Sequence, residues 1–97
     1  MTSKAEYDFY PDGTLDKYWK NEEGQVSRDD GPALEYAEGI REWFKNGLRH
    51  RENGPAIIWD DGFCLYYLND NLYFKKEYWK EIEKIKKRRE RKDKRIK

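Results

Sequence analysis

An internal repeat constrains this chain more than any other feature of its sequence. One copy spans residues 39–62, and an acidic residue followed by glycine marks both of its ends. A degenerate copy precedes it, and a third copy begins after Gly62 and breaks off after Phe74. Similar segments fold into units that stack on one another, and short aromatic segments separated by turn residues are typical of β-hairpins. The sequence therefore predicts a mainly β fold, an antiparallel β-meander of about three hairpin repeats over residues 1–74.

The expected strands pair across turns rich in glycine, asparagine and acidic residues. The first hairpin is predicted from an aromatic segment at 7–10, a Pro-Asp-Gly turn at 11–13 and a return strand at 14–21. Matching strands are predicted at 34–36 and 57–59. Each of them follows a Gly-Pro-Ala tripeptide, whose proline suits the first position of a strand.

The return strands align their aromatic residues in two neighbouring columns. One column holds Tyr18, Trp43 and Tyr66, and the next holds Trp19, Phe44 and Tyr67. Adjacent residues of a strand point to opposite faces, so both faces of the sheet are expected to carry aromatic side chains. One face is expected to form the core. The other is either covered by the C-terminal segment or exposed to a partner.

Residues 75–97 replace the rest of the third copy and predict a helix packed on or at the end of the sheet. Tyr78, Ile82 and Ile85 recur at helical spacing and form one apolar stripe. From Lys86 onward the segment is almost wholly charged. The packed part of this amphipathic helix should end near that residue, and the basic tail beyond it is either frayed or a solvated helix.

Composition favours a folded protein in spite of few aliphatic residues. Leu, Ile, Val and Phe number 17 of 97, below the fifth that usually separates folded from disordered chains. Four Trp, eight Tyr and four Phe offset this deficit, because each buries a large area with few rotatable bonds. One cysteine excludes an intrachain disulfide, and no segment approaches the roughly 20 apolar residues of a membrane span. We expect a cytoplasmic protein (host cytoplasm if a phage encodes it) without membrane contact.

The charge is divided between the two parts of the chain. Residues 1–74 hold 8 Lys and Arg against 15 Asp and Glu, whereas residues 75–97 hold 13 against 5, so the net charges are −7 and +8. Such an asymmetry indicates an acidic body with a basic end that can attract an anionic partner.

One motif of the repeat resembles a known family. The segments 28–33 and 51–56 both read Arg-x-x-Gly-Pro-Ala, and each full repeat adds an acidic-Gly turn, an aromatic pair and an Asn-Gly turn. This pattern resembles the MORN-like repeats of small bacterial proteins of antitoxin type and of proteins from large phages and giant viruses. The resemblance covers roughly residues 7–74. It implies a β-meander with a role in protein contacts, and it brings no catalytic residues.

The chemistry-bearing residues do not assemble a catalytic, cofactor or metal site by their spacing. His50 is the only histidine, which excludes a His-pair metal site, and we interpret it as a solvated or stacking side chain. Cys64 falls on a strand away from His50, so a Cys-His pair is not expected. The acidic pairs lie at predicted turns, where carboxylates stay hydrated. We therefore expect a protein that is not an enzyme and that binds no cofactor.

Binding to another protein is the function that the pattern favours, and the resemblance implies a phage or antitoxin-type inhibitor of a bacterial protein. Trp, Tyr and Arg are the residue types that anchor protein interfaces. The candidate contact residues are Trp43, Arg49, His50, Arg51 and Tyr66.

Two alternatives remain open at this point. The basic tail predicts weak, non-specific contact with nucleic-acid phosphates, because Lys and Arg release the counterions of the backbone. The candidate residues for that contact are Lys86, Lys87, Arg88, Arg89, Arg91 and Lys92. Open sheet edges also allow a homo-oligomer to form by edge-to-edge pairing.

Overall fold

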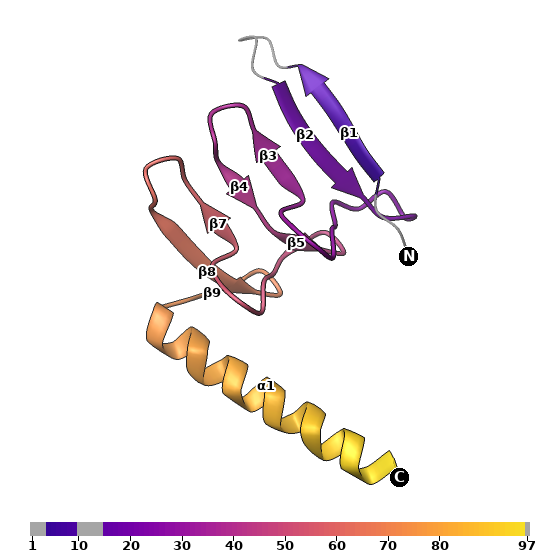
Figure 1. The fold of residues 1–97 in the computed structure, drawn as a ribbon, viewed down its shortest axis with the longest axis vertical. Helices are drawn as coiled ribbons and strands as arrows, with labels where there is room; N and C mark the ends of the chain where they lie inside the picture. Colours follow the sequence, from indigo (N-terminus) through magenta and orange to yellow (C-terminus); the bar gives the residue numbers. More distant parts are fainter. Residues whose placement is uncertain (1–3, 10–14, 97) are drawn as a thin grey trace.

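The computed structural model describes residues 4–9 and 15–96 and shows a β-sheet that ends in one long helix (Figure 1). The predicted turn at 11–13 lies outside the described residues. The elements are β1 (Lys4–Phe9), β2 (Leu15–Lys20), β3 (Leu34–Tyr36), β4 (Arg41–Glu42), β5 (Phe44–Lys45), β6 (Leu48–Arg49), β7 (Ile57–Ile58), β8 (Cys64–Leu68), β9 (Asn71–Tyr73) and α1 (Lys75–Ile96).

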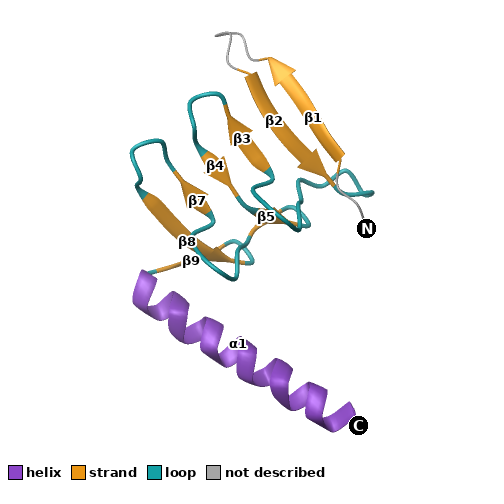
Figure 2. Ribbon diagram, in the orientation of Figure 1, coloured by secondary structure: helices purple, strands orange, loops and turns teal. Residues whose placement is uncertain are grey.

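The main sheet has the strand order β1-β2-β3-β4-β7-β8-β9, and every neighbouring pair is antiparallel. Strands β5 and β6 form a separate short hairpin that leaves the sheet between β4 and β7 (Figure 2). The chain thus runs back and forth along the sheet, and the β5–β6 hairpin branches from it between two of these passes. The predicted β-meander with one C-terminal helix is confirmed.

Left-handed backbone at the turns explains the residues that punctuate the repeat. Gly39 (φ 100°) and Gly62 (φ 93°) turn the chain from β3 to β4 and from β7 to β8. At the opposite end of the sheet, Asn46 (φ 52°) and Asn69 (φ 50°) take the same backbone region. Glycine has no Cβ to clash there, and asparagine tolerates the region better than most residues. The turns that the sequence predicts at these positions are therefore present.

The aromatic columns have a different register from the expected one. The Trp19 amide donates to the Ala33 carbonyl, and the Trp43 amide donates in the same way to the Ala56 carbonyl. Trp19 is therefore the counterpart of Trp43, whereas the sequence pattern paired it with Phe44. The error arose from aligning Asn21 with Asn46, because the first copy has one residue fewer between its tryptophan and its asparagine. By the same pattern, the counterpart of Trp43 in the third copy is Tyr66.

Helix α1 packs at the β8–β9 end of the sheet, as predicted (Figure 1). Tyr78 and Ile82 are buried against Leu68 of β8, and Ile85 is the last helix residue that joins this cluster. Residues 86–92 continue the helix with exposed side chains. The predicted end of packing near Lys86 is thus correct, and the basic segment is a solvated helix rather than a frayed end.

Candidate binding groove

The Arg-x-x-Gly-Pro-Ala motif folds into a loop that is held by its own arginine. In the second copy, Arg51 donates from Nε to Asn53 Oδ1 (3.0 Å) and from Nη1 to the Pro55 carbonyl oxygen (3.0 Å). The same guanidinium lies 3.9 Å from the centre of a Trp43 ring, a cation–π contact. We call this arrangement the Arg51 clasp. Burial lowers the pKa of the Arg51 guanidinium, but it stays charged because its ordinary pKa is far above neutral.

The first copy repeats the clasp with its own residues. Arg28 donates from Nε to Asp30 (3.0 Å) and from Nη1 to the Pro32 carbonyl oxygen (3.1 Å), and its guanidinium lies 3.8 Å from the centre of a Trp19 ring. A Cβ on Gly31 would come within 2.9 Å of this guanidinium carbon. The glycine of the motif therefore lets the arginine approach closely, because a side chain there would displace the flexible end of the arginine, a reason that the sequence pattern did not reveal.

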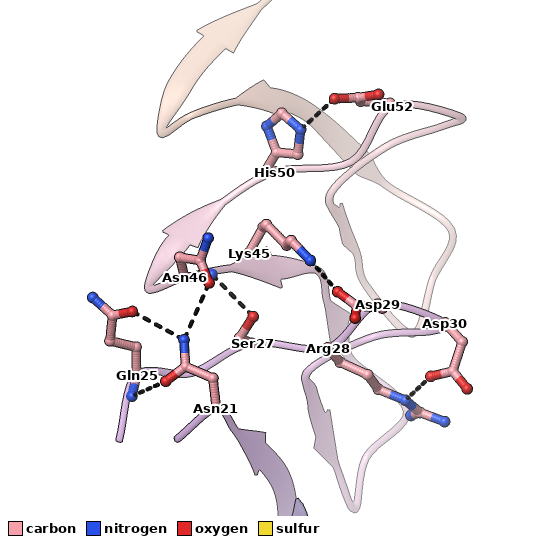
Figure 3. A network of polar contacts seen from close by, with 10 residues as sticks. All are labelled: Asn21, Gln25, Ser27, Arg28, Asp29, Asp30, Lys45, Asn46, His50 and Glu52. Carbon is pink, nitrogen blue, oxygen red and sulfur yellow. Dashed lines mark hydrogen bonds and ion pairs between the residues drawn. The ribbon is translucent and has the colours of Figure 1, made fainter. Parts of the chain in front are cut away.

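His50 is fixed by hydrogen bonds and is not the solvated or stacking side chain that the sequence indicated. Its Nδ1 accepts from the Asn69 amide (3.0 Å), so the neutral ring carries its proton on Nε2, which donates to Glu52 Oε2 (2.9 Å). The counterpart of His50 in the first copy is Ser27, whose Oγ accepts from the Asn46 amide (3.0 Å; Figure 3). In both copies this side chain ties one repeat to the left-handed asparagine of the next.

A groove of about 710 Å³ opens between the two clasps. Residues 28–32 form one wall and residues 51–53 form the other, while Trp43, Lys45 and His50 lie between them. The walls are loops of consecutive repeats, so the groove marks the junction between the first copy and the second. Because each wall is anchored by its arginine, the groove is formed before any ligand arrives.

Both signs of charge meet in this groove. Lys45 forms an ion pair with Asp29 of one wall (Figure 3), and the hydrogen bond from Lys45 holds the pKa of the Asp29 carboxyl below its ordinary value. On the opposite wall, Glu52 Oε1 lies 2.8 Å from Arg89 Nη1 of α1. The hydrogen bond from Arg89, followed by that from His50, lowers the pKa of Glu52. Both carboxylates are therefore ionised at neutral pH, and the groove presents fixed charges.

The structure brings together three of the five predicted protein-contact residues. Trp43, His50 and Arg51 all line the groove. Arg49 instead lies over the rings of Phe44 and Tyr67, with its Nε 3.5 Å from Glu42 Oε1. Tyr66 packs against Tyr78 of α1, with 4.8 Å between the ring centres, and burial raises the pKa of its hydroxyl.

The predicted nucleic-acid contacts lie on the exposed stretch of α1. The exposed residues are Lys86, Lys87, Arg88, Arg89, Arg91 and Lys92. Arg89 is bound to Glu52 in the loop between β6 and β7, and Arg88 lies 3.9 Å from Glu81. The basic residues are therefore presented by a helix whose position is set partly by the groove wall.

Sequence reasoning missed Lys45, Arg28 and Tyr78. The signal for Arg28 was present, because it begins the same motif as Arg51. Lys45 sits in a short hairpin where nothing in the sequence distinguishes it from a solvated lysine. Tyr78 was recognised as part of an apolar stripe, but its hydroxyl bonds to the Arg51 carbonyl and the Gly54 amide depend on where the helix docks.

Comparison with protein-family models, curated proteins and solved structures finds no match to this chain. Within the described residues, no cluster of three His, Cys, Asp or Glu side chains is arranged to hold a metal ion. Across residues 4–9 and 15–96, no helix has the length and apolar character needed to cross a membrane.

Proposed function

We propose that this chain is a non-enzymatic protein-binding module and that the groove between the Arg28 and Arg51 clasps is its contact surface. The observation that carries the proposal is the groove itself, a preformed opening of about 710 Å³ with an indole, two guanidiniums and a lysine on its surface. Arginine and aromatic residues dominate the energetics of protein interfaces. A wall that is already ordered loses little conformational entropy on binding, which favours affinity.

The repeats give this proposal its family context. The Arg-x-x-Gly-Pro-Ala motif and the meander support the MORN-like resemblance, in which the repeats serve protein contacts. On that basis we propose that the module acts in the cytoplasm on a bacterial protein, as an inhibitor of phage or antitoxin type.

Affinity capture with paired variants tests the proposal. Lys45→Glu reverses a half-exposed charge inside the groove, whereas Glu38→Lys reverses an exposed charge in the turn at the other end of the sheet. The wild-type protein and the Glu38→Lys control should retain the same protein from a bacterial lysate, and Lys45→Glu should lose it at equal thermal stability. Equal retention by all three proteins, or no retained protein, would contradict the proposal.

A second candidate function is association with nucleic acid through α1. The observation that favours it is the exposure of the basic residues over 86–92 on an ordered helix. Each phosphate contact makes the plot of log binding constant against log salt concentration steeper by roughly one unit. Lys87→Glu with Arg91→Glu should therefore weaken binding to mixed-sequence DNA and flatten its salt dependence, as followed by fluorescence anisotropy. An unchanged slope in the double variant would exclude the helix as the contact.

A further inference from the structure

The two junctions between repeats are built from matching hydrogen bonds. At the first junction, the Arg28 amide donates to the Phe44 carbonyl (3.2 Å); at the second, the Arg51 amide donates to the Tyr67 carbonyl (3.2 Å). Ser27 at the first junction and His50 at the second likewise each accept a hydrogen bond from the backbone amide of an asparagine in the next copy. One junction can therefore be compared with the other residue by residue.

At the second junction, Tyr78 of α1 occupies the position between the repeats. Its hydroxyl accepts from the Gly54 amide (3.2 Å) and donates to the Arg51 carbonyl, while its ring packs on Tyr66. Tyr78 is fully buried there. Eleven residues further along the helix, Arg89 binds Glu52 on the same loop. This chain thus shows how a tyrosine on a helix docks on an Arg-x-x-Gly-Pro loop.

At the first junction, the counterparts of these two backbone groups are the Gly31 amide and the Arg28 carbonyl. Within the part of the chain that the structure describes, neither group has a hydrogen-bond partner. Both residues line the groove. The counterpart of Glu52 is Asp29, which also lies on the groove wall. The groove therefore offers the same backbone donor and acceptor that the adjacent junction uses for Tyr78, whereas its carboxylate is already paired with Lys45.

We propose that the groove binds a tyrosine side chain presented by a helix of the partner protein. This inference rests on the proposed protein-binding function and specifies what the groove recognises. The Gly31 amide donates to the incoming phenol oxygen, and the phenol hydroxyl donates to the Arg28 carbonyl. The guanidinium of Arg51 covers Trp43, whereas its counterpart in the third copy is Phe74, which is 84% exposed. The incoming ring therefore stacks on the Arg51 guanidinium and not directly on the Trp43 ring.

The groove also differs from the second junction in a way that sets the partner's charge. Lys45 holds the position that buried Leu68 holds in the third copy, where Ile82 packs against it. Ile82 follows Tyr78 by four residues, which is one helical turn. Lys45 pairs with Asp29, but its side chain is half exposed and its ammonium has donors to spare. A carboxylate one turn after the tyrosine can share this ammonium, so the preferred partner helix carries a Tyr-x-x-x-Glu pattern.

Peptides with the sequence of α1 test this inference. The probe is a peptide of residues 75–92 with Ile82→Glu, and its control carries Tyr78→Phe in addition. Each is titrated into the full-length, isotope-labelled protein and followed by amide NMR. The first peptide should cause a saturable shift of the Gly31 amide, and the control should bind about 30-fold more weakly, as expected for two lost hydrogen bonds. The Lys45→Glu protein should instead prefer a peptide with Ile82→Lys.

Three results would overturn the inference. These are no shift at Gly31, equal affinity of the two peptides, or shifts centred on Gly54, which would mean that the peptide displaces α1. If any of them occurs while affinity capture still depends on Lys45, the binding module stands and the tyrosine specificity falls. If peptide binding is as expected but capture fails, recognition of tyrosine stands and the proposed cellular role falls.

Discussion

Tyr78 is the residue through which α1 is fastened to the repeats, and removing its hydroxyl is the most direct test of this architecture. Tyr78→Phe keeps the ring that packs on Tyr66 and removes only the oxygen that joins the Arg51 carbonyl to the Gly54 amide. Gly54 is buried. Its amide therefore has no access to bulk water as a replacement partner in the native structure.

The expected cost follows from those contacts. Each neutral hydrogen bond contributes about 1 kcal/mol, and a buried group left without a partner costs about 1–3 kcal/mol. We therefore expect a loss of about 2–3 kcal/mol in the free energy of unfolding. For a domain of this size, 1 kcal/mol changes the melting temperature by roughly 4–8 °C, so Tm should fall by about 8–24 °C.

Urea denaturation, monitored by tryptophan fluorescence, measures the loss in the free energy of unfolding. Hydrogen exchange at the Gly54 amide measures the loss in the free energy of local opening. A change of about 2 kcal/mol corresponds to roughly 30-fold faster exchange. Tyr73→Phe is the matched control, because Tyr73 packs against the same cluster and its hydroxyl has no hydrogen bond within the described residues. It should change stability by less than about 0.5 kcal/mol. Equal effects of the two substitutions, or unchanged Gly54 exchange in Tyr78→Phe, would refute the reasoning.

Three further predictions follow from the same contacts. Burial raises the pKa of Tyr78 above 10. The stability that this shift provides is complete below pH 10 and is lost as pH rises through the folded-state pKa. Melting temperatures measured at increasing alkaline pH should therefore fall, and they should fall less in Tyr78→Phe. Arg51→Lys removes a forked donor that a lysine cannot reproduce and should cost about 1–2 kcal/mol in urea denaturation, with altered fluorescence of Trp43. Arg89→Ala should raise the pKa of Glu52, since the hydrogen bond from Arg89 is the largest cause of its lowering; carboxyl NMR titration measures it, and an unmoved pKa would mean that the ion pair does not form in solution.

The repeat made most of the fold predictable, because turn chemistry is local. Gly39 and Gly62 mark turns in the sequence and take left-handed backbone in the structure. The predicted register was wrong at Trp19, because the first two copies differ in the number of residues on either side of their asparagines. Hydrogen bonds between strands decide such a register, and these depend on residues far apart in the chain.

The candidate site was less predictable, because its parts act across repeats. Trp43 and Arg51 could be selected by residue type, yet the clasp that joins them was not visible in the pattern. His50 was interpreted as a solvated or stacking side chain because its neighbours in sequence are charged. Its actual partners are the amide of Asn69 and the carboxylate of Glu52, and only the stacking of copies brings the first of these to it.

The comparison of the two junctions explains why one groove stays open while the next is covered. Where the third copy has Leu68 and Tyr73, the second has Lys45 and His50. Apolar side chains at these positions give α1 a surface on which burial is favourable, at about 25 cal/mol per Å² of apolar area. A lysine and a hydrogen-bonded histidine at the same positions remove that driving force and leave directional contacts in its place. The same β-scaffold thus binds its own helix through apolar packing at one junction, whereas polar side chains at the other junction leave the groove open.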